Sequence, residues 1–72
     1  MRSVATIVAN GKPRDVSDGA TIADLLAQIG WKPEWVVVEH NGEAVHRRSL
    51  GERRLADGDR LEIVRAVAGG SG

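Results

Sequence analysis

The carboxyl end of the chain offers its clearest chemistry. The last seven residues read AVAGGSG, and Gly69 and Gly70 have no Cβ atoms, so this backbone can enter a channel barely wider than itself. A terminal carboxylate is ionised at neutral pH because its pKa is about 3.5, and it resists nucleophilic attack until it is activated. The competing interpretation is a frayed tail or a remnant of cloning.

Side chains elsewhere offer less reactive groups. The chain has no cysteine, which excludes disulfides, cysteine metal sites and a thiol nucleophile. His40 and His46 are the two imidazoles, and without a cysteine or carboxylate partner they make a poor zinc site, so we expect solvated histidines. Ser71 has a hydroxyl but no dedicated base. We therefore expect no metal site and no catalytic side chain.

Two sets of charged residues have ordinary structural explanations. A basic stretch is surrounded by acidic residues and lacks nearby aromatic stacking partners, so we expect a charged loop rather than a binding patch at Arg47, Arg48, Arg53 and Arg54. Turn and helix-cap positions, rather than acid–base catalysis, account for Asp18, Asp24, Asp57 and Asp59.

Length and charge limit the functions that remain. The 72 residues predict one domain, and its ten basic side chains balance ten acidic ones, so the long-range attraction to nucleic acid is missing. The longest apolar run, at 35–38, is far shorter than the roughly 20 residues that span a bilayer. We expect a cytoplasmic protein that binds neither nucleic acid nor membrane.

Two Asn-Gly dipeptides, at 10–11 and 41–42, predict hairpin turns because both residues tolerate positive φ angles. The first turn would join strands at 2–9 and 13–16. The second would join a strand in WVVVEH to a short one at 43–45, and the three consecutive valines favour a strand buried on both faces inside the sheet. A last strand, RLEIVRAV, would follow a turn at 57–59.

One amphipathic helix should lie between these strand pairs. Thr21 and Asp24 have the spacing of a capping box, and Gly30 supplies a left-handed stop. Apolar residues follow the helical period at Ile22, Leu25, Leu26 and Ile29. After the helix, Trp31 and Trp35 flank Pro33 in a connector; we expect Trp35 in the core and leave Trp31 open. Leu50 and Leu55 should anchor the later loop.

This order predicts an α+β fold, a mixed sheet of four to five strands with one principal helix packed across it. The domain would occupy residues 1–68 and a flexible tail residues 69–72. The sequence resembles the β-grasp sulfur carriers of the ubiquitin-like superfamily, most closely those of thiamine biosynthesis. That resemblance is carried, in order along the chain, by DGATIADLLAQIG, VVVEHNGEAV, LADGDRLEIV and AVAGG.

The resemblance implies a protein co-substrate rather than an enzyme. An E1-like adenylating enzyme would use ATP to activate the terminal glycine, and a persulfide would then displace AMP to leave a thiocarboxylate for a thiazole synthase. The carrier itself would bind no cofactor. Gly70 would be the working end, reached through a threading tail of Val67, Ala68, Gly69 and Gly70. A C-terminal peptidase would remove Ser71 and Gly72; without such processing, Gly72 would be the activated residue.

Three other functions remain open at this point. A molybdopterin-type sulfur carrier needs the same tail, and so does a ubiquitin-like modifier joined to target lysines. A regulatory β-grasp binding module needs no free diglycine, so the tail argues against it. The fate of the activated terminus depends on partner proteins, and the sequence does not decide between a sulfur carrier and a ubiquitin-like modifier.

Overall fold

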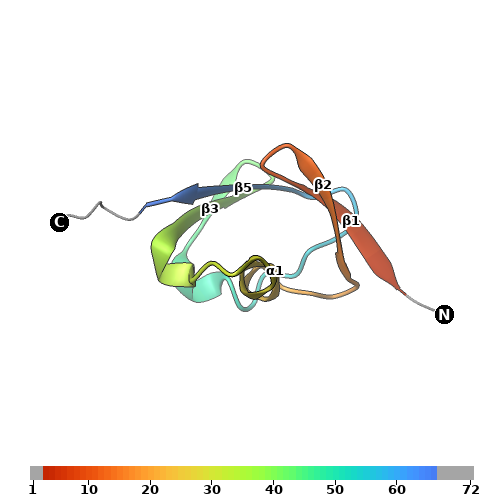
Figure 1. Cartoon of the computed structure of the whole chain (residues 1–72), viewed down its shortest axis with the longest axis horizontal. Helices are drawn as coiled ribbons and strands as arrows, with labels where there is room; N and C mark the ends of the chain where they lie inside the picture. Colours follow the sequence, from red (N-terminus) through yellow and green to blue (C-terminus); the bar gives the residue numbers. More distant parts are fainter. Residues whose placement is uncertain (1–2, 67–72) are drawn as a thin grey trace.

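The computed structural model describes residues 3–66 and has one principal helix beside a five-stranded sheet (Figure 1). Strand order across the sheet is β2-β1-β5-β3-β4, with β1 parallel to β5 and the other neighbours antiparallel. The elements in chain order are β1 (Val4–Ala9), β2 (Lys12–Ser17), α1 (Ile22–Ile29), the 3₁₀ helix η1 (Pro33–Trp35), β3 (Val36–His40), β4 (Glu43–Val45), the 3₁₀ helix η2 (Arg47–Ser49) and β5 (Arg60–Arg65). The predicted β-grasp architecture is confirmed.

Both predicted hairpin turns form. Asn10 and Gly11 have φ angles of 52° and 81°, and Asn41 and Gly42 have angles of 53° and 85°. Positive φ at both central residues is typical of the tight turns whose twist matches that of paired strands. The first turn sets the register of β1 against β2, and the second sets that of β3 against β4.

Helix α1 begins and ends as its sequence predicts. Asp24 N donates to Thr21 Oγ1 at 3.1 Å, and Thr21 N donates to Asp24 Oδ2 at 3.0 Å, which completes the capping box. Gly30 ends the helix at a φ of 83°, and Trp31 N then donates to the Leu26 carbonyl oxygen at 2.9 Å. These bonds satisfy backbone groups that a helix end would otherwise leave open.

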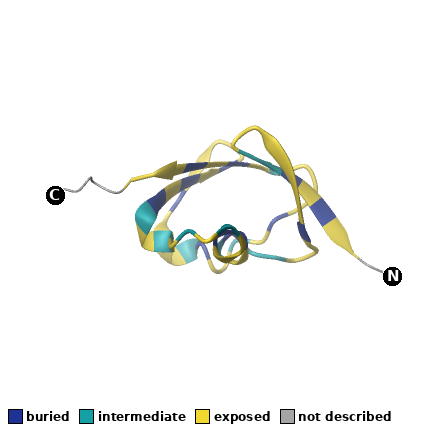
Figure 2. Cartoon of the chain, in the orientation of Figure 1, coloured by how far each residue is buried: buried dark blue, intermediate teal, exposed yellow. Residues whose placement is uncertain are grey.

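The core lies between α1 and the inner face of the sheet (Figure 2). Leu25 and Leu26 of the helix are 1% and 0% exposed, as their spacing predicts. Leu50 and Leu55 close the same core from the loop before β5, where they are 2% and 3% exposed. Over residues 3–66, no helix is long and apolar enough to cross a membrane.

Strand β3 differs from the prediction on one point. It lies inside the sheet, between β5 and β4, as expected. Its burial alternates, however: Val36 and Val38 are buried, whereas Val37 is 51% exposed. The expectation of burial on both faces is wrong, because the single principal helix covers only one face of this sheet.

Candidate functional site

Strand β5 leads directly into the glycine-containing tail. Arg65 is its last residue, and Ala66 is the last residue that the structure describes. The predicted flexible tail and its site residues lie outside the described residues, and they remain predictions; these are Val67, Ala68, Gly69, Gly70, Ser71 and Gly72. The described part of the site is therefore the root of the tail and the surfaces beside it.

The root of the tail is tied to η1 through the backbone. Ala66 N donates to the Trp35 carbonyl oxygen at 2.8 Å, one residue beyond the pairing of Arg65 with Val36. This bond continues the pairing of β5 with β3 by one residue, to Ala66 after β5 and Trp35 before β3. The chain consequently leaves the domain from a fixed point at Ala66.

The Arg65 side chain contacts two indole rings at the same place. Its Cζ lies 5.8 Å from the ring centroid of Trp31 and 5.8 Å from that of Trp35. Lys32 Nζ lies 5.4 Å from the Trp35 centroid. A cation at such a distance is attracted by the electron-rich face of the ring. We call Trp31, Trp35 and Arg65 the tail-root cluster.

The tail-root cluster corrects the expectation for Trp35. This ring was expected to fill the core, but both tryptophans are only partly buried and pack against the edge of the core. A large aromatic ring can cover apolar neighbours on one side and present a face to a cation on the other. The two rings thus close the end of the core from which the tail departs.

The outer face of the sheet carries an exposed pair of valines next to the tail root. Val37 of β3 lies opposite Val64 of β5, and they are 51% and 57% exposed. Glu39 and Glu62 form the next outward-facing cross-strand pair, which places two carboxylates beside the apolar pair. Paired apolar side chains that face solvent are available to contact another protein.

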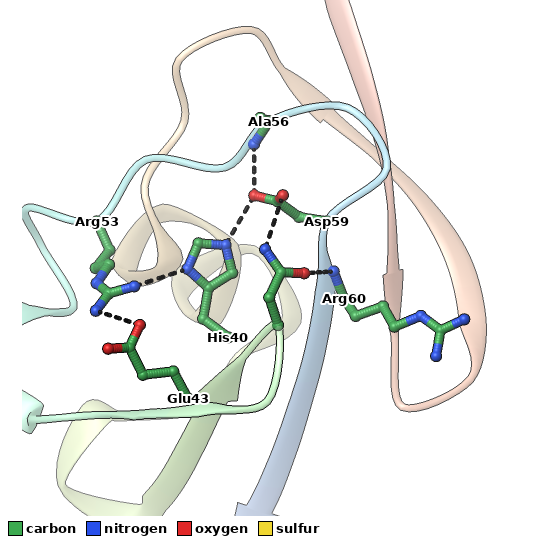
Figure 3. Close-up of polar contacts among 7 residues, drawn as sticks. His40, Glu43, Arg53, Ala56, Asp59 and Arg60 are labelled. Atoms are coloured by element: carbon green, nitrogen blue, oxygen red, sulfur yellow. Dashed lines mark hydrogen bonds and ion pairs between the residues drawn. The ribbon is translucent and has the colours of Figure 1, made fainter.

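At the opposite end of β5, His40 forms a polar network (Figure 3). It is 8% exposed, and its Nε2 lies 2.7 Å from Asp59 Oδ2 while its Nδ1 lies 3.2 Å from Arg53 Nη1. A guanidinium has only donors, so Nδ1 must accept and the imidazole proton is assigned to Nε2, which donates to Asp59. The expectation of a solvated His40 is wrong, whereas His46 is exposed.

Arg53 also differs from the expected charged loop. Its Nη2 donates to Glu43 Oε1 at 3.2 Å, so the guanidinium joins β4 to the buried His40 (Figure 3). Arg47, Arg48 and Arg54 are exposed, as expected of a charged loop. Arg53 therefore belongs to the network that closes this end of the domain.

The Asp59 carboxylate is stabilised by several donors at once. Burial acts to raise its pKa, but hydrogen bonds from Ala56 N at 2.8 Å, from His40 at 2.7 Å and from Asn41 Nδ2 at 3.1 Å together hold that pKa below its ordinary value. Hydrogen bonds to the ionised form favour it over the protonated one. This arrangement fixes the turn that leads into β5.

The other acidic residues also have structural roles. Asp57 Oδ1 accepts a hydrogen bond from Thr6 N at 2.8 Å, Asp24 caps α1, and Asp18 stands in the exposed turn before it. Turn and cap chemistry is thus confirmed for these positions. Within residues 3–66, no three histidine, cysteine or acidic side chains gather closely enough to hold a metal ion.

Two features of the site escaped the sequence-based interpretation, although strand alternation could have found both. His40 follows Val36 and Val38 at the inward period of two, which predicts burial. Arg65 follows Leu61 and Ile63 in the same way, and this spacing directs its side chain toward the tryptophans. Both residues have polar side chains, so a search for alternating apolar residues passes over them.

Comparison with known proteins places the chain in a family. A family model described as "ThiS family" matches residues 6–70. The chain is 36% identical over 61 residues to "Sulfur carrier protein ThiS" of Thermus thermophilus, and the match covers 85% of this chain and 94% of that protein. It resembles the crystal structure of a thiamine biosynthesis protein (ThiS) from Geobacter metallireducens with a TM-score of 0.75 at 31% identity, covering 90% of this chain and 99% of that one.

Longer proteins match as well. The chain is 40% identical over 65 residues to "Thiazole synthase" of Paramagnetospirillum magneticum, a match that covers 90% of this chain and 20% of that protein. It therefore spans about a fifth of the length of that relative. The family match extends over both hairpins, the helix and the tail root, so the chain belongs to the ThiS family.

Proposed function

We propose that this protein is a sulfur carrier for thiamine biosynthesis, with its sulfur held at the carboxyl group of a tail glycine. The observation that carries the proposal is the family match, which runs through Gly70 and so includes the diglycine. The match to a protein named as a sulfur carrier, over nearly its whole length, supports the same function. We take Gly70 as the working end for this reason.

The chemistry requires activation of a poor electrophile. A carboxylate oxygen of the glycine attacks the α-phosphorus of ATP, and pyrophosphate leaves to give an acyl adenylate. A donor persulfide then attacks the acyl carbon and displaces AMP. A thiol of the donor finally cleaves the sulfur–sulfur bond, which leaves a thiocarboxylate on the carrier and a disulfide on the donor. ATP and persulfide belong to partner proteins, and the carrier holds no cofactor of its own.

The geometry of residues 3–66 supports the role of co-substrate. The ionisable groups brought together there, those around His40 and Asp59, bind one another and structural backbone groups. The domain instead offers a rigid root for the tail and an exposed valine pair beside it. An adenylating enzyme can contact this face while it receives the tail.

Two further partners follow from the proposal. A thiazole synthase is the proposed sulfur acceptor, because a segment like this chain forms about a fifth of proteins that carry that name. A peptidase is required only if residues follow Gly70 in the protein as first made. We place the reaction in the cytoplasm, where ATP is available to the activating enzyme.

Pyrophosphate exchange with the cognate adenylating enzyme tests the proposal. A chain that ends at Gly70 should support exchange, whereas the 72-residue chain should be a poor substrate until trimmed. Gly70→Trp in the shortened chain should leave the fold intact and abolish exchange, because a large side chain obstructs a narrow channel. Equal exchange by both lengths would move the working end to Gly72, and exchange by the tryptophan variant would show that the glycines are a frayed end.

A further inference from the structure

We infer that the tail-root cluster is a clamp that fixes the point and direction of tail departure, and that Arg65 is a positioning residue for activation of the tail. The inference rests on the proposed function, because it assigns a role within the encounter with the adenylating enzyme. Arg65 lies two residues before Val67, the first residue of the threading tail, which is outside the described residues. Neither the diglycine nor the family match identifies this cluster.

The position of Arg65 in β5 is the first observation. Leu61 and Ile63 face the core and are 2% and 5% exposed, and Arg65 is the next residue on that side. An apolar residue would have continued the core there. Instead the guanidinium lies 5.8 Å from the centroids of two indole rings that are partly buried against the core. A planar cation can stack on aromatic faces and remain in contact with water.

Both tryptophans lie where local structure restricts the backbone, one directly after α1 and the other in η1. Trp31 directly follows the left-handed Gly30, and its N–H donates to the Leu26 carbonyl oxygen at 2.9 Å. Trp35 ends a 3₁₀ helix that begins with Pro33, whose ring restricts the backbone. The backbone at Trp31 and at Trp35 is therefore fixed, and each indole ring is held in place beside Arg65.

Trp35 contacts the last two described residues in two ways. Its ring faces the Arg65 guanidinium, and its carbonyl oxygen accepts the Ala66 N–H at 2.8 Å. Strand ends without such ties fray easily. Together these contacts fix the chain at Ala66 relative to the core, so that the residues beyond it start from one place.

A fixed root matters because the outer face and the tail must engage one partner together. Val64 precedes Arg65 in β5 and forms the exposed pair with Val37. When a partner binds that face, a fixed root presents the tail at the mouth of its channel, which raises the local concentration of the reactive end. A loose root spreads the tail over many directions and lowers the fraction of productive encounters.

The test compares Arg65 variants of the chain that ends at Gly70. Arg65→Met removes the cation but keeps a long apolar side chain, and Arg65→Lys keeps the charge but loses the planar guanidinium. Arg48→Met is the matched control, since Arg48 is an exposed arginine outside the tail-root cluster. Pyrophosphate exchange gives KM and kcat for each carrier, and backbone ¹⁵N relaxation gives the order parameter of the Ala66 amide.

We expect Arg65→Met to raise the KM of the carrier about fivefold, a change of the size that loss of a cation–aromatic contact produces. The kcat should stay near that of the unsubstituted chain, because the reacting carboxyl group is unchanged. Arg65→Lys should restore part of the KM, and Arg48→Met should leave it unaltered. The Ala66 order parameter should fall in Arg65→Met while the order parameters of β1 and β3 stay the same.

Three results would overturn the inference. An unchanged KM in Arg65→Met, with normal exchange by the unsubstituted chain, would contradict the clamp and leave the proposed function intact. A matching rise of KM in Arg48→Met would show a general effect of charge. An Ala66 order parameter unaffected by Arg65→Met would also contradict the clamp. A different result, no exchange by the unsubstituted chain ending at Gly70, would contradict the proposed function.

Discussion

Strand β5 is held by directional hydrogen bonds at its first residues and by contacts between a cation and two aromatic rings at its last. At the beginning, Asp59 joins His40 and Asn41, and Asn41 Oδ1 accepts the Arg60 N–H at 2.8 Å. Asn10 extends this pattern along the strand: its amide accepts from Ile63 N at 2.7 Å and donates to the Ile63 carbonyl oxygen at 3.1 Å. Each of these bonds depends on exact distance and angle.

The last residues of β5 have a more tolerant arrangement. The Arg65 guanidinium lies 5.8 Å from the centroids of two rings, and one backbone hydrogen bond holds Ala66. Contacts between a cation and an aromatic face permit a range of geometries, and this cluster remains partly exposed. The network around the buried His40 therefore stabilises the fold, whereas the partly exposed tail-root cluster positions a segment that a partner must receive.

Truncation of a buried core side chain should cause the largest loss of stability. It should affect both ends of β5. Leu26 is 0% exposed, so Leu26→Ala should lower the free energy of unfolding by about 2–4 kcal/mol through lost burial and a residual cavity. Urea denaturation measures the change, with Gln28→Ala on the exposed side of α1 as control. A neutral result for Leu26→Ala would mean that the helix register is wrong.

Loss of the buried imidazole should have the next largest effect. His40→Ala leaves Asp59 and Arg53 without their shared partner, and we expect a loss of about 1–3 kcal/mol in unfolding free energy. The control is His46→Ala, because the exposed His46 ring accepts only one hydrogen bond, from Arg48 N at 3.2 Å, and its truncation should cost less. Equal losses for the two variants would contradict a special role of the network at the start of β5.

The same network should make stability depend on pH in a defined direction. Because the folded pKa of Asp59 lies below its ordinary value of 3.8, the ionised carboxylate stabilises the folded state above that pH, and this contribution is lost as pH falls through the folded pKa. The difference in unfolding free energy between the unsubstituted protein and Asp59→Asn should be constant near neutrality and shrink below about pH 3.8. A difference that instead grows on acidification would reverse the assigned sign.

Arg65→Met should have the smallest effect on stability, less than about 1 kcal/mol, because its contacts are partly exposed. Thermal unfolding followed by far-ultraviolet circular dichroism measures it. Substitution at the start of β5, as in His40→Ala, should lower stability, whereas substitution at its end should weaken partner engagement. A loss as large as that of His40→Ala would mean that the tail-root cluster is part of the structural core.

Local signals in the sequence were sufficient for most of the fold. The Asn-Gly turns and the capping box from Thr21 to Asp24 depend on neighbouring residues, and both formed as predicted. The burial of β3 was misjudged because its valine run does not reveal how many faces the helix covers. His40 and Arg65 obtain their roles from partners distant in the sequence, Asp59 and Trp31 among them, which composition and charge do not identify.

The location of sulfur on the chain distinguishes a sulfur carrier from a protein modifier or a binding module. The chain ending at Gly70 should be incubated with the cognate adenylating enzyme, ATP and a persulfide donor, and then examined by intact and fragment mass spectrometry. The account predicts replacement of one oxygen by sulfur at the carboxyl group of Gly70, with loss of the product when ATP is omitted. An unmodified carboxyl group under conditions in which the enzyme is active, or an isopeptide bond to a lysine in place of a thiocarboxylate, would contradict it.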